Sequence, residues 1–226
     1  MKDYYTQKLS AERLLQVYEI APPRVQQYLE AEIGFVLSKI KPTDSVLELG
    51  CGYGRVIKRL ASRAKAVIGI DTSLETLYLA QDFLCGSNLV HLYAMNAIEL
   101  GFHDQQFDVV ICIQNGISAF KVDQRKLIQE AIRVTRPGGI VLFSSYSGKF
   151  WEDRLQWFRL QAEHGLVGEI DEEKTANGVI VCRDGFRATT IEANDFLYLT
   201  SSLGVKAIIT EVDGSSLFCV IRNDIE

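Results

Sequence analysis

The amino-acid sequence predicts an α/β protein with a Rossmann-like, doubly wound, mostly parallel seven-stranded sheet. From residue 45 onward, short apolar segments alternate with segments of helical periodicity, and a glycine-rich turn follows the first apolar segment. This alternation is typical of a parallel sheet with helices on both faces. The last two apolar segments are joined by Asp213-Gly214-Ser215-Ser216, which indicates an antiparallel C-terminal hairpin.

Residues 1–42 are expected to form a helical N-terminal cap. Ser10 is a plausible N-cap for a short first helix, and Pro22-Pro23 ends it. Pro23 can occupy the first turn of a second helix. The apolar stripe of that helix consists of Val25, Leu29, Ile33, Val36, Leu37 and Ile40.

Residues 43–147 are expected to form a cofactor-binding core with five strands. A capping box, Thr72-x-x-Glu75, is predicted to start one helix, and Asp123 is predicted to cap another. Arg136-Pro137-Gly138-Gly139 leads into the last of these strands. The expected strands are residues 45–49, 66–70, 89–93, 107–113 and 140–144.

Residues 148–190 are expected to form an α+β insertion that acts as a substrate lid. Its first part, 149–164, has a helical pattern, and Asn177-Gly178 is a strong hairpin signal. Residues 191–226 then supply the last helix and the terminal hairpin, with Thr189 or Thr190 as the expected helix cap. No linker is evident, so the 226 residues are predicted to form a single domain.

Composition excludes several classes of function. The 24 Lys and Arg against 29 Asp and Glu give a net charge of −5, which provides no general affinity for nucleic acid or for anionic membranes. No apolar run approaches the roughly 18 residues that a membrane helix needs. No signal peptide is evident, so a cytoplasmic location is expected. Five dispersed cysteines and three scattered histidines predict no metal site.

The most informative segment is Val46-Leu47-Glu48-Leu49-Gly50-Cys51-Gly52-Tyr53-Gly54. Its three alternating glycines allow the backbone to approach a ligand closely at the carboxyl end of a strand. Asp71 follows Gly50 by 21 positions and ends the next strand, where a carboxylate can accept both hydroxyls of a ribose. The pair predicts a ligand that contains a nucleoside.

Two cofactor classes fit such a layout. Dinucleotide enzymes use GxGxxG, but here Arg55 stands at the third glycine position and Gly54 comes one residue early. Glu48 would also place a negative charge near the phosphates of a dinucleotide. These residues favour a nucleoside that carries a positively charged group.

The sequence resembles the class I S-adenosylmethionine-dependent methyltransferases. VLELGCGYGR resembles their glycine-rich first motif, VIGIDTS their acidic second strand, FDVVICIQN their fourth strand and RVTRPGGIVLF the approach to their fifth strand. The resemblance covers about residues 43–147 and the closing hairpin, and it implies S-adenosylmethionine as the cofactor. It does not identify a subfamily.

The resemblance also implies roles for individual residues. The loop Gly50, Cys51, Gly52, Tyr53 and Gly54 would line the methionine part, with Glu48 beneath it. Asp71 would hold the ribose, with Thr72 and Ser73 beside the adenosine and Asn96-Ala97 at the adenine. Asn96 replaces the acidic residue that the family often has there. The expected residues facing the methionine or the methyl acceptor are Ile113, Gln114 and Asn115.

Alternatives stay open for several of these residues. Asn96 and Asn115 can also be turn formers, and Asp71 can cap a helix without ligand contact. Arg187 can clamp an acidic substrate or lie on a surface strand. Trp151, Trp157 and Phe158 can form the roof of an acceptor site or pack on the sheet. The tyrosines that could offer hydroxyls, or simply pack, are Tyr4, Tyr5, Tyr18, Tyr28 and Tyr146.

No catalytic base is identified. Methyl transfer from a sulfonium needs mainly in-line positioning, and a base matters only for a protonated acceptor. His103 is expected in a loop and His91 on a strand, which leaves His164 as the remaining histidine candidate. The expected partner is a small-molecule methyl acceptor, and the sequence does not predict an oligomeric state. The alternatives are a catalytically silent nucleoside-binding or regulatory protein and a nicotinamide-dependent oxidoreductase.

Overall fold

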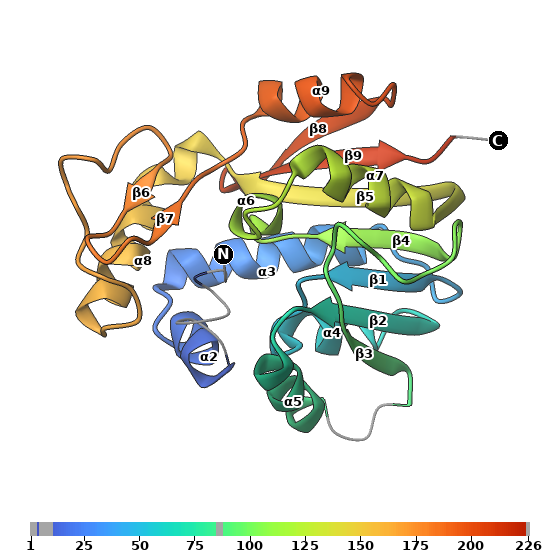
Figure 1. Ribbon diagram of the computed structural model, residues 1–226, viewed down its shortest axis with the longest axis horizontal. Helices are drawn as coiled ribbons and strands as arrows, with labels where there is room; N and C mark the ends of the chain where they lie inside the picture. Colours follow the sequence, from blue (N-terminus) through green and yellow to red (C-terminus); the bar gives the residue numbers. More distant parts are fainter. Residues whose placement is uncertain (1–3, 5–10, 85–87, 225–226) are drawn as a thin grey trace.

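The computed structural model describes residues 4, 11–84 and 88–224. Seven strands form one sheet in the order β3-β2-β1-β4-β5-β9-β8 (Figure 1). Strands β1 to β5 pair in parallel, and β9 lies antiparallel between β5 and β8. The predicted fold class is therefore confirmed. The strands are β1 (Ser45–Leu49), β2 (Ala66–Asp71), β3 (Val90–Ala94), β4 (Phe107–Cys112), β5 (Thr135–Tyr146), β8 (Ala207–Val212) and β9 (Ser216–Arg222).

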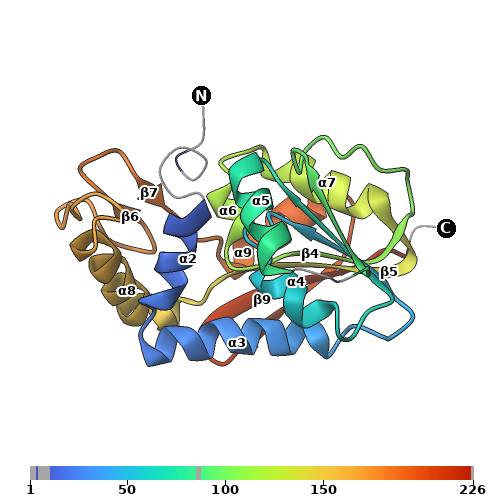
Figure 2. The ribbon, with the colours of Figure 1, turned by 90° about the horizontal axis from the view of Figure 1, so that it is seen from below.

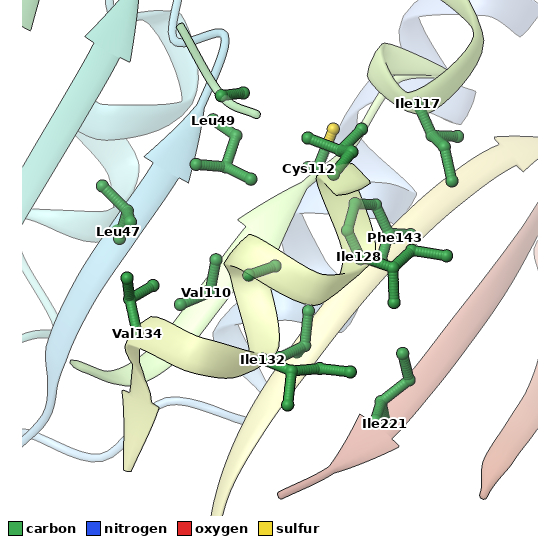
Figure 3. Packing of buried hydrophobic residues seen from close by; sticks show 14 of the residues in the cluster. Leu47, Leu49, Val110, Cys112, Ile117, Ile128, Ile132, Val134, Phe143 and Ile221 are labelled. Carbon is green, nitrogen blue, oxygen red and sulfur yellow. The ribbon is translucent and has the colours of Figure 1, made fainter. Parts of the chain in front are cut away.

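Helices cover both faces of this sheet (Figure 2). Apolar residues of α3 (Pro23–Leu37), α4 (Arg55–Leu60) and α5 (Leu74–Phe83) share one buried cluster with β1, β2 and β4. A second cluster joins the sheet to α7 (Gln124–Val134) and α9 (Ala193–Ser201). Figure 3 shows this second cluster, in which Ile128 and Ile132 of α7 lie over Val110, Phe143 and Ile221 of the strands. All residues of β4 except Asp108 are buried, which explains the nearly unbroken apolar run that predicted it.

A third cluster lies beyond the sheet. It joins α2 (Ala11–Glu19) and the start of α3 to α8 (Trp151–Glu163) and to the small sheet of β6 (Ile180–Val181) and β7 (Arg187–Ala188). The Trp157 indole N–H donates to the carbonyl of Val17 at 3.0 Å, across 140 residues of sequence. The boundaries expected at 42, 147 and 190 remain a prediction, but the cap and the insertion share one core.

Several predicted helix starts can be compared with the structure. Asp123 caps α7, since its Oδ1 accepts from the N–H groups of Arg125 and Lys126. The predicted capping box at Thr72 is wrong, because α5 is capped one residue later by Ser73, whose Oγ accepts from Thr76 N–H. The cap of α9 is Glu192 rather than Thr189 or Thr190. Ser10, Tyr5 and Cys85 lie outside the described residues.

Three connections complete the comparison. Asn177-Gly178 forms the expected tight turn, with φ of 51° and 79°, and Ala176 and Val179 exchange both backbone hydrogen bonds. Strand β5 is longer than predicted because residues 135–139 extend its start and residues 145–146 extend its end, with a register shift opposite Phe107 and Val109. The short helix α6 (Gly116–Ala119) was not predicted.

None of the helices within the described part of the chain combines the length and the apolar character needed to cross a membrane.

Candidate cofactor-binding site

A cavity of about 1010 Å³ opens at the carboxyl ends of β1, β2 and β4. The strand order reverses between β1 and β4, which is where open parallel sheets bind ligands. All but two of the predicted site residues line this cavity, the exceptions being Gly54 and Asn115. The predicted residues that line it are Glu48, Gly50, Cys51, Gly52, Tyr53, Asp71, Thr72, Ser73, Asn96, Ala97, Ile113 and Gln114.

The glycine-rich loop between β1 and α4 forms one wall. Its backbone is anchored by the N–H groups of Gly50 and Cys51, which both donate to the carbonyl of Ile70 at 2.9 Å. Gly50 has φ of +73°, and a Cβ there would lie 2.4 Å from the ring of Phe120. A Cβ on Gly54, with φ of +88°, would lie 2.6 Å from Leu84. Gly50 therefore permits close approach at the cavity, whereas Gly54 permits packing against α5.

Asp71 connects the second strand to this loop. Its Oδ2 accepts from Gly52 N–H at 3.0 Å and its Oδ1 accepts from Ser73 N–H at 2.9 Å. Burial raises the pKa of Asp71, and these N–H groups oppose that rise. Each carboxylate oxygen can accept a further hydrogen bond, so Asp71 can position the loop and still bind a hydroxyl of a ligand.

Glu48 lies buried beneath the loop with one oxygen unsatisfied. The carboxyl group is only 4% exposed, and its Oε2 has no hydrogen-bond partner. Burial raises the pKa of Glu48 to about 8, while the positive charge of Arg55 lowers it and Asp71 raises it further. A buried carboxylate with a free oxygen suits a cationic ligand group.

Arg55 is a site residue that the sequence reasoning missed. In the sequence, Arg55 stands out only as a departure from the dinucleotide pattern, and its position directly after Gly54 is the one signal that could have placed it at the site. Its guanidinium lines the cavity and lies over the ring of Tyr18, 4.7 Å from the ring centre. The Nε and Nη2 atoms are buried without a hydrogen-bond partner.

The end of β4 supplies a second wall around Gln114. Its backbone N–H donates to Glu32 Oε2 and to Ser144 Oγ, both at 2.8 Å. Its side-chain Oε1 accepts from the Tyr18 hydroxyl at 3.1 Å, whereas its Nε2 is buried without a partner. Glu32, which was also missed, is fully buried on α3 and receives a further hydrogen bond from Ser216. Burial raises the pKa of Glu32 to about 7, and its hydrogen bonds oppose that rise.

The two predicted asparagines differ in their surroundings. Asn115 has φ of 62°, and its Nδ2 donates to the Thr189 carbonyl at 2.9 Å. Its Oδ1 accepts from Ser145 Oγ at 2.8 Å, so the side chain ties the end of β4 to β5 and to the segment at Thr189, and it does not line the cavity. Asn96 lines the cavity and also closes a local turn, because its Oδ1 accepts from Ile98 N–H at 3.2 Å.

An aromatic chamber adjoins the part of the cavity near Glu48. Trp157 and Phe158 both line this chamber and also belong to the third cluster. The two roles left open by the sequence, covering an acceptor site and packing in a core, are therefore compatible. Arg187 lines the cavity from an exposed position on β7, whereas Trp151 packs against the cluster without lining the cavity. The other aromatic residues of the chamber are Tyr4, Tyr18, Tyr28, Tyr146 and Phe186.

The structure gives none of the three histidines a place in the cavity wall. His164 is exposed, and its Nδ1 lies 2.8 Å from the carbonyl of Leu160 one turn earlier, so the structure does not bring it to the other predicted site residues. His91 and His103 are exposed on β3 and in a loop. Across the described ranges, no group of three histidine, cysteine or acidic side chains is placed to hold a metal ion.

Comparisons with known proteins identify the class of this fold. Residues 46–139 match a family described as a methyltransferase domain. The ubiquinone biosynthesis O-methyltransferase of Klebsiella pneumoniae is 31% identical over 110 residues, which are 47% of this chain and 45% of that protein. The chain thus spans less than half the length of the curated relatives it matches.

Solved structures extend the likeness over most of the chain. A SAM-dependent methyltransferase from Methanosarcina mazei has a TM-score of 0.63 at 20% identity, covering 85% of this chain and 98% of that one. The PH0226 protein of Pyrococcus horikoshii has a TM-score of 0.70 at 19% identity, covering 94% and 99%. At such identities these structures establish the fold alone. Residues 46–139 of the core predicted from the sequence are therefore similar to methyltransferase domains in sequence, and most of the chain is similar to a solved methyltransferase in fold.

Proposed function

We propose that this chain binds S-adenosylmethionine and transfers its methyl group to a small-molecule acceptor. The observation that carries the proposal is the pair of carboxylates near the ends of adjacent strands, the buried Glu48 beneath the glycine loop and the half-buried Asp71 beyond it. The unsatisfied Oε2 of Glu48 fits a cationic amino-acid end, and Asp71 fits the two hydroxyls of a ribose. The residues present therefore suit this cofactor.

The acceptor side of the cavity supports a small molecule. Its walls come from the cap and the insertion, whose shared core encloses an aromatic chamber beside Gln114. The name of the relative from Klebsiella pneumoniae, which refers to ubiquinone biosynthesis, favours the same acceptor class.

The mechanism follows from what these side chains can do. When bound, S-adenosylmethionine would supply a methyl group attached to a sulfonium sulfur, and the sulfur would leave as a neutral thioether. Burial raises the pKa of Tyr146 to about 12 and raises that of Tyr18 as well, so both hydroxyls stay protonated at neutral pH and act as hydrogen-bond donors. The protein then contributes orientation and exclusion of water rather than proton removal.

Thermal unfolding with different ligands tests the cofactor assignment. A ligand at 100 times its dissociation constant stabilises the folded state by about 2.7 kcal/mol. We expect S-adenosylmethionine and S-adenosylhomocysteine to raise the melting temperature and NAD to leave it unchanged. A shift with NAD alone would show that the chain is a nicotinamide-dependent protein instead.

A second candidate function is nucleoside binding without turnover, and the histidine-free wall of the described cavity favours it. Incubation with S-adenosylmethionine labelled in its methyl group and a metabolite extract separates the two. A labelled small molecule supports the transferase. Binding of the cofactor with no labelled product from any extract supports the silent protein.

A further inference from the structure

Arg55 brings an unpaired positive charge into the cavity. Its Nε and Nη2 atoms are buried and donate to no acceptor, although a guanidinium offers five N–H donors. Leaving a buried charged donor unsatisfied is costly, so such a group indicates a missing anionic or oxygen-rich partner. On the same helix, Arg59 has its partner, because its Nη1 lies 2.6 Å from Glu30 Oε2.

The surroundings of Arg55 hold its guanidinium in place without using its donors. Arg55 is the first residue of α4 and follows Gly54 directly. The ring of Tyr18 lies against the guanidinium, 4.7 Å away, and the Tyr18 hydroxyl is fixed by Gln114. Stacking on an aromatic face leaves the N–H edge of a guanidinium available for a carboxylate, which it can bind through two parallel hydrogen bonds.

The cavity therefore places the unpaired guanidinium of Arg55 near the unsatisfied carboxyl oxygen of Glu48. Arg55 is close enough to Glu48 to influence its ionisation, yet neither forms an ion pair with the other in the described part of the chain. An α-amino acid group carries the complementary pair, an ammonium and a carboxylate. A phosphate would satisfy Arg55 but would offer no cationic group to Glu48.

We propose that Arg55 binds the α-carboxylate of the methionine part of the cofactor while Glu48 receives its ammonium. The inference rests on the proposed cofactor and adds the residue that recognises its negative end. Tyr18 then acts as a positioning residue, because it connects Arg55 to the wall at Gln114.

Calorimetric titration of the full chain with three ligands tests the assignment. The ligands are S-adenosylhomocysteine, its decarboxylated analogue S-adenosyl-3-thiopropylamine, and 5′-methylthioadenosine, which lacks the whole amino-acid group. We expect the unaltered chain and the control Arg59→Gln to bind S-adenosylhomocysteine at least about tenfold more tightly than the decarboxylated analogue. In Arg55→Gln, affinity for S-adenosylhomocysteine should fall by roughly 10- to 100-fold, while the other two affinities stay within about threefold.

Other outcomes overturn the assignment. Unchanged affinity of Arg55→Gln for S-adenosylhomocysteine would mean that Arg55 serves another group, such as an anionic acceptor. An equal loss for all three ligands would mean that Arg55 only supports the fold. Arg55→Lys keeps the positive charge but loses the planar guanidinium, so its affinity for S-adenosylhomocysteine should lie between those of the unaltered chain and Arg55→Gln. It replaces Arg55→Gln in the experiment if that variant fails to fold. If the unaltered chain binds none of the three ligands, the proposed function fails and the role of Arg55 fails with it.

Discussion

Glu48 and Glu32 are buried carboxyl groups that hold their protons unusually tightly. The pKa of Glu48 is raised to about 8 and that of Glu32 to about 7, in both cases mainly by burial. Their positions differ, since Glu48 has an unsatisfied oxygen in the cavity wall, whereas Glu32 accepts a hydrogen bond from the backbone N–H of Gln114. Both therefore couple protonation to the stability of the ligand-free protein.

Replacing Glu48 with glutamine should flatten the pH dependence of stability. A carboxyl whose pKa is higher in the folded state than its ordinary 4.5 stabilises the fold most below that value, and loses this contribution as pH rises towards about 8. Glu48→Gln stays neutral, so at pH 8 it should be more stable than the unaltered chain by on the order of a few kcal/mol. Denaturant unfolding from about pH 5 to 8 measures this, and an unchanged slope would contradict it. A smaller dependence of stability on pH should remain in the variant, because Glu32 still has a raised pKa.

Replacing Asp71 with alanine should weaken cofactor binding and also loosen the glycine loop. The variant leaves Gly52 and Ser73 N–H groups without their acceptor, which we expect to cost about 1–3 kcal/mol of stability. Affinity for S-adenosylmethionine should fall by at least about tenfold. The matched control is Asp123→Ala, which also removes a carboxylate from two N–H groups but lies outside the cavity. Calorimetry that shows equal cofactor affinity for both variants would remove Asp71 from the site.

Sequence alone identifies some of these residues better than others. Glu48 and Asp71 stand at fixed offsets from three glycines, so strand order places them at the cavity without further information. Glu32 contacts a backbone N–H 82 positions later, and nothing local in a helical stripe indicates that contact. The role of Arg55 could not be predicted from the sequence, because it depends on the ring of Tyr18, which lies on another helix.

At the level of elements, α2 closes against the glycine loop. A Cβ on Gly52 would lie 3.1 Å from Leu14 Cδ2, and Ala11 N–H donates to Thr76 Oγ1 of α5 at 3.0 Å. The Arg13 guanidinium donates to the carbonyl of Gly165 at 2.6 Å, at the end of α8. Helix α2 thus joins the cofactor loop, α5 and the insertion.

Replacing Gly52 with valine should abolish cofactor binding more than it harms the fold. The residue has φ of +52°, which strains a β-branched side chain, and the added atoms meet Leu14 at the cavity wall. We expect about 1–3 kcal/mol lower stability and at least about a 100-fold loss of affinity for S-adenosylhomocysteine. Gly214→Val is the control, because Gly214 has φ of +62° in the β8–β9 turn with open space around it. Similar affinities in the two variants would mean that the loop does not meet the ligand.

The predicted elements succeeded where periodicity and burial agree. Strand β4 was predicted within one residue of its bounds, and α3 begins at Pro23 as predicted but ends at Leu37, three residues before the end of the predicted stripe. Helix α6 has four residues and begins after two residues of positive φ, Gln114 and Asn115, so it carries no periodic signal. The start of α5 was misplaced because Thr72 and Ser73 are both good caps, and only the backbone shows which one is used.

At the scale of the whole molecule, the buried residues divide into two clusters on the sheet and one between cap and insertion. The third cluster forms the wall of the aromatic chamber, with Trp157 at its centre: 4% exposed, 6.2 Å from the ring of Tyr18 and hydrogen-bonded to Val17. Sequence reasoning treated the two segments separately because they are more than a hundred residues apart. Their common core depends on the parallel sheet that brings them together.

Replacing Trp157 with alanine should loosen both segments together. We expect a loss of about 3–5 kcal/mol in stability, since a large buried ring and its hydrogen bond are removed. Hydrogen exchange should accelerate in α2 and in α8 while the amides of β1 and β4 stay protected. Tyr198→Ala on α9 is the control, because its side chain is 68% exposed and should change stability by less than about 0.5 kcal/mol. Faster exchange in α8 alone would mean that the two segments open independently.

The hydrogen bond from Trp157 to Val17 has a bearing on how new acceptor preferences could be engineered or could evolve. Grafting residues 148–190 from a relative would replace only one side of the chamber. The relative's residue at the position of Trp157 would then have to pack against Val17 and Tyr28 of this chain. A working chimera must therefore exchange the beginning of the chain and the later segment as one unit, and natural variants that alter one of them should carry compensating changes in the other.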